Sequence, residues 1–334
     1  MAARRSDPPT VQRAGLAGEA PPPAPAGRPA LHAVLVTYRR PDDLATMLAR
    51  LAEQQRPPDT LVVVDNDPAE SARAAVTAAA GDRSGTAVTY LPSGANLGPA
   101  GGIALGMRHV LGHAADADWV VLLDDDDHPT SPSLLAELAE LGDSLRAGDP
   151  TVAGVGLCGA RFEASRGRSV PVPDDQLAGP VAVDWIGGNN FPLYAVQAVR
   201  AVGVFDDRLF FGFDDLEYGL RLVGAGFGVY AHGDLWRRER AAHGRLGIDR
   251  SPSRTLDEPT WRRYYSLRNL VHILRRQGER GGAARLAARG LVKPIYNLPR
   301  GPRLALRHLA LNGRAVVDAY RGRMGQTVRP APKS

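Results

Sequence analysis

Four adjacent aspartates follow a short apolar segment in the first half of the chain. The segment Trp119-Val-Val-Leu-Leu123 predicts a buried strand, and the acidic run 124–127 comes directly after it. Oxygen ligands of this kind suit a hard divalent cation such as Mg²⁺ or Mn²⁺, which would also relieve the repulsion among the carboxylates. The run therefore predicts metal-assisted chemistry on a diphosphate. The alternative is a solvated acidic turn that ends at Pro129.

The elements that must position this run alternate between strand and helix. Strands are expected at 31–37, 61–65, 87–91 and 119–123, and helices at 41–54, 69–80 and 103–112. This alternation predicts an α/β fold, a mostly parallel sheet flanked by helices. Ligands of such sheets bind at the carboxyl ends of the strands, where segment 37–39, Asp65 and the acidic run all lie.

A glycine-rich segment, 96–102, follows the third predicted strand and is expected to be a loop. It lacks the G-x-G-x-x-G spacing of a dinucleotide site and comes after the wrong strand for one. It also lacks the Gly-Lys-Ser/Thr of a phosphate-binding P-loop. The segment therefore excludes both of these nucleotide-binding motifs.

The second half of the chain carries two further polar clusters, at 184–191 and 213–221. The cluster at 213–221 predicts the start of a helix, since acidic side chains favour the positive end of a helix dipole. Capping would account for Asp214 and for Asp215. Glu217 and Arg221 would form an ordinary pair one helical turn apart.

Composition limits the possible disulfides, cellular location and domain divisions of the protein. The chain has 334 residues and one cysteine, Cys158, so it has no intrachain disulfide. No signal-peptide pattern and no apolar stretch of roughly 20 residues is visible, so we expect a cytoplasmic protein. The divisions expected are a disordered Pro/Ala-rich tail (1–29), a catalytic domain (30–255), an Arg-rich helical region (256–325) and a disordered tail (326–334).

Six short motifs, in their joint order and spacing, resemble the family 2 glycosyltransferases of the GT-A fold. They are Val34-Leu-Val-Thr-Tyr38-Arg39, Val62-Val-Val-Asp65-Asn66, Asn96-Leu97-Gly98, Leu122-Leu123-Asp124-Asp125-Asp126, Trp185-Ile-Gly-Gly188 and Phe213-Asp214-Asp215-Leu-Glu217-Tyr-Gly-Leu-Arg221. The last motif, the acidic run and the segment 264–270 are similar to the actinobacterial galactofuranosyltransferases in particular. That narrower resemblance implies UDP-galactofuranose as donor and a lipid-linked cell-wall glycan as acceptor, although the flanking domains of those enzymes are missing here.

The resemblance implies a role for each matching residue. The resemblance implies that eight residues line the nucleotide-sugar pocket, namely Thr37, Tyr38, Arg39, Asp65, Asn96, Gly98, Asp124 and Asp125. Those implied to border the donor sugar and the acceptor are Trp185, Gly188 and Asn189. Asp215 would be the catalytic base, with Asp214 beside it.

The metal ligands implied by the resemblance are Asp124 and Asp126, with Mn²⁺ or Mg²⁺ as the cofactor. The family also places a histidine after the helix that bears the base, and the pattern departs there. His232 comes early and His243 comes late, and we favour His243. Both could instead be surface histidines without a metal role.

Together these features predict inverting transfer of a sugar from a nucleotide sugar to a hydroxyl. The rival hypotheses are a nucleotidyltransferase and an inactive glycosyltransferase-like binding subunit. The Arg-rich helices would either cap the catalytic domain or touch anionic lipid on the inner face of the plasma membrane. No aromatic-interleaved basic motif indicates nucleic-acid binding.

Overall fold

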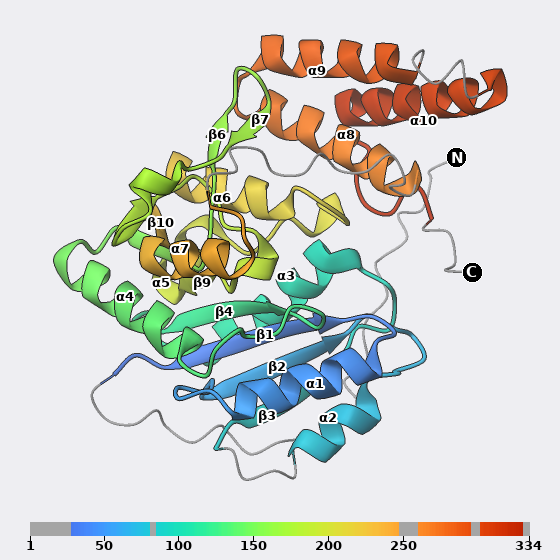
Figure 1. Ribbon diagram of the computed structural model, residues 1–334. Helices are drawn as coiled ribbons and strands as arrows, with labels where there is room; N and C mark the ends of the chain where they lie inside the picture. The colour runs from blue at the N-terminus through green and yellow to red at the C-terminus, as the bar shows by residue number, and fades with distance from the viewer. Residues whose placement is uncertain (1–27, 81–84, 247–259, 295–300, 330–334) are drawn as a thin grey trace, which may run out of the picture.

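The computed structural model describes residues 28–80, 85–246, 260–294 and 301–329 (Figure 1). Within them, the main sheet has eight strands in the order β3-β2-β1-β4-β9-β5-β10-β8. The bounds of these strands are β1 Leu31–Thr37, β2 Thr60–Asp65, β3 Ala87–Pro92, β4 Trp119–Asp124, β5 Val152–Gly156, β8 Pro180–Ala182, β9 Leu193–Ala195 and β10 Gly228–His232. A separate hairpin pairs β6 (Arg161–Glu163) with β7 (Arg168–Val170).

The first four strands form a parallel half-sheet. β1 lies between β2 and β4, and β3 continues the sheet beyond β2. The antiparallel strand β9 joins β4 to β5, which pairs in parallel with β10. In this register Thr37 lies opposite Asp65, and Val36 lies opposite Asp124. The predicted α/β fold is confirmed, and the strand ends that carry the polar motifs share one edge.

Seven α-helices accompany the described part of the catalytic domain. Their bounds are α1 Pro41–Ala52, α2 Arg73–Ala80, α3 Gly98–Leu111, α4 Leu134–Gly148, α5 Val196–Val202, α6 Asp214–Gly224 and α7 Gly233–Ala242. Short 3₁₀ helices lie at η1 Asp174–Gln176, η2 Gly188–Asn190 and η3 Asp207–Leu209. Helix α2 begins four residues later than the helix expected at 69–80.

The glycine-rich segment 96–102 is not the loop that its composition predicted, because α3 begins at Gly98. The glycines allow this helix to lie very close to the sheet. A Cβ atom at Gly102 would come within 2.6 Å of Val36 Cγ1, and one at Gly106 within 2.3 Å of Val34 Cγ1. Close helix–strand packing therefore explains the composition that we took as a sign of a loop.

The Arg-rich region forms three helices above the sheet in Figure 1, α8 Thr260–Arg276, α9 Arg280–Val292 and α10 Pro302–Arg321. A buried apolar cluster joins them to α6 through Leu216, Leu270 and Leu274. Residues 1–27 and 330–334 of the predicted tails lie outside the described residues. Tyr265 hydrogen-bonds Val328 and Arg268 hydrogen-bonds Thr327, so the described part of the expected C-terminal tail is fixed on α8.

Candidate active site

Two strand ends and the segment after β1 hold the acidic run in place. Thr37 Oγ1 donates a 2.7 Å hydrogen bond to Asp125 Oδ2, so the second aspartate is bonded to the end of β1. Arg40 donates to the other oxygen of Asp125 at 3.0 Å and also pairs with Asp126. No sequence motif indicated this role for Arg40. The acidic run therefore has one arginine counter-ion from the segment that precedes α1.

Asp124 is the aspartate at the end of β4. Burial raises its pKa to about 7, and the charges of Asp126, Asp214 and Asp125 add to the increase. A carboxyl group with this pKa is only partly ionised at neutral pH until positive charge is supplied to it. The environment of Asp124 therefore favours the approach of a cation or a cationic ligand.

The two aspartates that begin α6 lie beside the same place. Burial raises the pKa of Asp214 to about 6, and burial with the charges of Asp214 and Asp124 raises that of Asp215 well above its usual range. The backbone N–H of Gly188 donates to Asp215 Oδ2 at 3.1 Å. A Cβ atom at Gly188 would lie 3.5 Å from Asp124 Oδ2 and 3.6 Å from Asp215 Oδ1. Gly188 thus lies between carboxylates that are far apart in the sequence.

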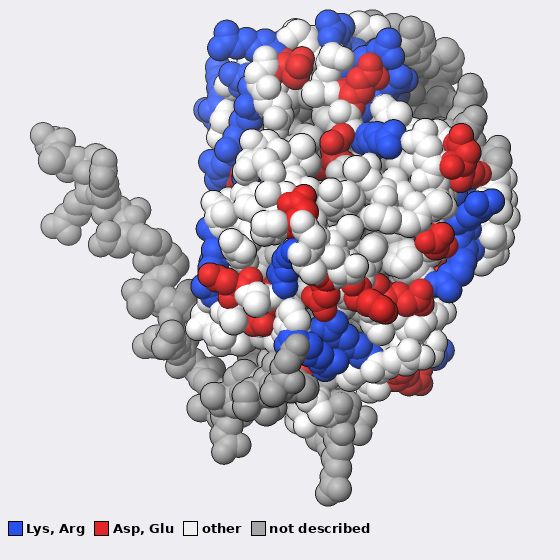
Figure 2. All heavy atoms as spheres, turned by 90° about the vertical axis from the view of Figure 1, so that its left-hand side faces the viewer, with Lys and Arg blue, Asp and Glu red and all other residues white. Residues whose placement is uncertain are grey.

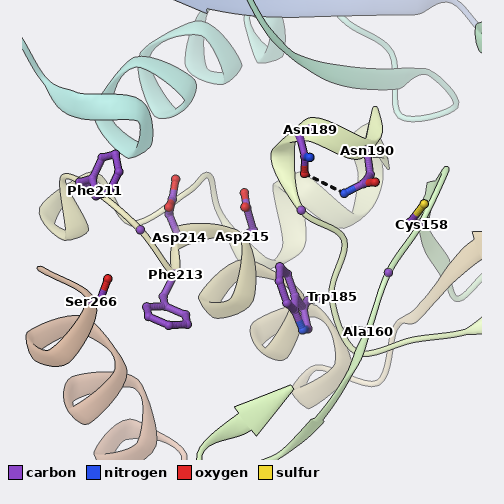
Figure 3. A pocket seen from close by; sticks show the side chains of 13 residues that line it. Cys158, Ala160, Trp185, Asn189, Asn190, Phe211, Phe213, Asp214, Asp215 and Ser266 are labelled. Atoms are coloured by element: carbon purple, nitrogen blue, oxygen red, sulfur yellow. Dashed lines mark hydrogen bonds between the residues drawn. The ribbon is translucent and has the colours of Figure 1, made fainter. Parts of the chain in front are cut away.

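A cavity of about 300 Å³ opens next to this junction. In Figure 3, Asp214 and Asp215 point to the same side of it, Trp185 lies beyond Asp215, and Ser266 reaches it from α8. Its lining residues are Cys158, Gly159, Ala160, Trp185, Gly187, Asn189, Asn190, Phe211, Gly212, Phe213, Asp214, Asp215 and Ser266. Burial raises the pKa of Cys158 to about 12, so its thiol is protonated and is no nucleophile.

Asp65, at the end of β2, is more enclosed by its own chain than its motif suggested. Asp65 is fully buried, and its oxygens accept hydrogen bonds from the backbone N–H of Asp67 and Ala72 and from the Tyr90 hydroxyl, each at 2.9 Å. In this structure Asp65 therefore holds the segment after β2. Asp67 pairs with Arg39, whose side chain is 62% exposed. The nucleotide contact implied for Asp65 stays a prediction.

The Asn96-Leu97-Gly98 motif fixes the start of α3. Asn96 Oδ1 accepts from the backbone N–H of Gly98 at 2.9 Å, and the Asn66 amide donates to the Gly98 carbonyl at 2.9 Å. Gly98 has a φ of 72°, and a Cβ atom there would lie 2.1 Å from the Phe210 carbonyl oxygen. Only glycine fits this backbone angle and this contact.

Neither histidine considered as a metal ligand lies in a formed cation site. His232 caps α7 by accepting from the Leu235 backbone N–H at 3.4 Å. His243, at the other end of α7, is exposed, and its Nδ1 bonds to the Glu239 carbonyl at 2.9 Å. Across the described residues, no three His, Cys, Asp or Glu side chains are grouped so as to hold a metal ion. The metal role of His243 stays a prediction.

Comparison with known proteins identifies the first part of the chain. Residues 33–155 match the family described as Glycosyl transferase family 2, a segment that runs from within β1 to within β5 and includes the acidic run. This part of the chain is therefore similar to the family 2 glycosyltransferases. This confirms the resemblance drawn from the six motifs.

Two curated relatives extend the similarity. Galactofuranosyltransferase GlfT1 of Mycobacterium tuberculosis is 38% identical over 201 residues, which cover 58% of this chain and 64% of the relative. The same-named protein of Mycolicibacterium smegmatis is 38% identical over 211 residues, covering 58% of this chain and 65% of that one. The chain thus spans less than two thirds of these relatives and is related to actinobacterial galactofuranosyltransferases.

A solved structure supports the fold. The mannosyltransferase PcManGT of Pyrobaculum calidifontis, in complex with GDP-Man and Mn²⁺, matches with a TM-score of 0.50 and 18% identity, covering 88% of each chain. This likeness shows the GT-A-like fold only. The predicted GT-A type is therefore confirmed as well.

Proposed function

We propose that this protein is an inverting, metal-dependent glycosyltransferase. It moves a sugar from a UDP sugar to a hydroxyl of a lipid-linked glycan. The donor that we propose is UDP-galactofuranose. The observation that carries the proposal is the convergence of Asp124 and Asp215 on Gly188. A carboxylate at the end of β4 and a carboxylate beside the cavity are thereby close enough to contact one substrate. The curated relatives, named as galactofuranosyltransferases, support the choice of sugar.

The acidic run fits a divalent cation. Asp124 and Asp126 would be its ligands, because carboxylate oxygens suit Mn²⁺ and Mg²⁺ and because these charges crowd one another. Asp126 would have to leave Arg40, with which it is paired. When bound, the cation would neutralise charge on the departing diphosphate.

Asp215 is suited to be the general base. Burial raises its pKa and so makes its carboxylate a stronger base than an ordinary aspartate, and the Gly188 N–H holds one of its oxygens. The acceptor oxygen would bond to the anomeric carbon as the bond from that carbon to the UDP phosphate oxygen breaks. The hydroxyl proton would pass to Asp215. One displacement of this kind inverts the anomeric centre.

The experiment that tests the proposal combines binding with turnover. Melting temperature is measured with UDP, GDP and their sugars, with and without Mn²⁺, because a ligand of the native state raises it. We expect a Mn²⁺-dependent increase with UDP that Asp126→Asn abolishes, and UDP release from UDP-galactofuranose when a glycan acceptor is added. Stabilisation by nucleoside triphosphates alone would point to a nucleotidyltransferase. Binding without turnover would point to a binding subunit.

We further propose that α10 meets an anionic lipid surface, as suits a lipid-linked acceptor. No helix among the described residues is long and apolar enough to span a bilayer. Helix α10 nevertheless exposes Leu304, Leu306 and Leu309 beside Arg303 and Arg307. Blue side chains gather near the top of Figure 2, at the height of the C-terminal helices in Figure 1. Sedimentation with anionic vesicles, lost in Leu306→Asp, would support this contact, and equal binding to zwitterionic vesicles would contradict it.

A further inference from the structure

The segment that leads into Asp214 and Asp215 has an unusual backbone. Phe210 has φ 63° and ψ −59°, and the Phe211 N–H donates to the Leu209 carbonyl at 2.7 Å, which makes the rarer, strained form of γ-turn. Phe213, directly before α6, is left-handed with φ 62°. Such residues cost about 1–3 kcal/mol each and persist only where their surroundings fix them. Something must therefore hold residues 209–213, called here the base loop.

Helix α8 supplies that support through Asn269, which is fully buried. Its amide nitrogen, which carries two hydrogens, lies within hydrogen-bond distance of three carbonyls of the base loop, those of Leu209 at 3.0 Å, Phe211 at 3.0 Å and Gly212 at 2.8 Å, so one hydrogen is shared. The base loop runs directly into Asp214, the first residue of α6, and Asp215 follows it. The support from α8 thus acts on the segment that leads into the proposed base.

Arg268, the preceding residue, fixes the orientation of Asn269. Its Nε donates to Asn269 Oδ1 at 2.9 Å, so the amide nitrogen must face the loop, and its Nη2 donates to the Leu209 carbonyl at 2.9 Å. The guanidinium is fully buried and lies 4.7 Å from the centre of the Tyr265 ring. The Nη1 atom of Arg268 donates to the Gly325 carbonyl at 2.7 Å. The arginine is held on several sides and can act as a rigid support.

We propose that Arg268 and Asn269 are positioning residues that hold the base loop and thereby aim Asp215 at the acceptor. The aiming of Asp215 rests on the proposed function, whereas the support of the loop does not. On the opposite side, the Phe210 carbonyl faces Gly98, so the loop is confined between α3 and α8. A misplacement of about 1 Å can cost about 100-fold in rate.

The test is Asn269→Ala, with Asn312→Ala as the matched control. The Asn312 amide donates to the Gly290 carbonyl at 2.7 Å, within the same helical region but away from the base loop. We expect Asn269→Ala to lower kcat by about 100-fold with little change in the donor KM, since the loop leads into Asp215 whereas most residues implied to bind the nucleotide lie at the ends of β1, β2 and β4. Asn312→Ala should keep the wild-type kcat. A normal kcat in Asn269→Ala, or a raised KM with an unchanged kcat, would overturn the proposal.

Hydrogen exchange separates this inference from the proposed function. We expect amide exchange of residues 209–215 to be faster in Asn269→Ala without any substrate, with exchange of β1 unchanged. This result would support the role of α8 even if the wild-type protein transferred no sugar, and unchanged exchange at 209–215 would refute it. If Asn269→Ala fails to fold, Arg268→Lys is measured in the same way. Its control is Arg275→Lys, because Arg275 donates to the Ala319 and Tyr320 carbonyls at 3.0 and 3.1 Å instead.

Discussion

Replacing Asp214 by asparagine should stabilise the metal-free protein at neutral pH. Burial raises the pKa of Asp214 from 3.8 to about 6. This difference of about 2 units corresponds to about 3 kcal/mol at about 1.4 kcal/mol per unit. Asparagine occupies nearly the same volume, carries no charge and keeps an oxygen to accept the backbone hydrogen bonds.

The sign of the pH dependence follows from linkage. Because the folded-state pKa lies above the unfolded one, the folded protein binds more protons between about pH 4 and pH 6, and its stability falls as pH rises through that window. The penalty is complete above the folded-state pKa and absent below about pH 4. The free energy of unfolding of Asp214→Asn should therefore exceed that of the wild type by about 3 kcal/mol at pH 8 and equal it at pH 4.

Thermal or urea unfolding in the presence of a chelator measures this effect. A gain of about 3 kcal/mol corresponds to an increase of about 5 °C in Tm for a protein of this size. Asp42→Asn, which removes an exposed carboxylate in the first turn of α1, is the matched control and should show no comparable gain. Destabilisation of Asp214→Asn at pH 8, or a gain in stability that is the same at pH 4 and pH 8, would contradict a cost of burying the Asp214 charge.

Three further predictions concern other parts of the site. Gly98→Ala should destabilise the protein by more than about 3 kcal/mol in urea unfolding, because its Cβ would lie 2.1 Å from the Phe210 carbonyl oxygen, and a stable variant would contradict this packing. Tyr90→Phe removes the hydroxyl that donates to Asp65 and should cost about 1 kcal/mol in the same assay, so no loss would mean that the bond contributes nothing. Arg40→Gln should tighten Mn²⁺ binding about 5-fold in calorimetric titration, because the competing cation is removed, whereas weaker binding would show that Arg40 supports the metal site.

The sequence predicted the parts of the fold that depend on local pattern. The apolar strand 119–123 and the helix that begins at 214 both appear where periodicity and charge indicated them. The glycine-rich segment was misassigned because Gly102 contacts β1 and Gly98 contacts the Phe210 carbonyl, and no local pattern reveals such contacts. Close packing between distant segments therefore limited the prediction of secondary structure.

The candidate site divides in the same way. The family resemblance implied that Asp124 and Asp215 serve one active site, and the structure places both beside Gly188. The enclosure of Asp65 by its own chain and the support of the base loop by Asn269 were not foreseen. Both depend on hydrogen bonds to backbone atoms, whose positions are set by the folded chain and not by residue type.

The most direct test of the account is the rate of sugar transfer by Asp215→Asn, compared with its affinity for UDP and Mn²⁺. Asp116→Asn, which alters an exposed carboxylate before β4, is the control. We predict that Asp215→Asn loses about 100- to 10,000-fold in kcat, as expected for removal of a general base, while its UDP affinity stays within a few-fold of wild type. Transfer at the wild-type rate by Asp215→Asn would contradict the account.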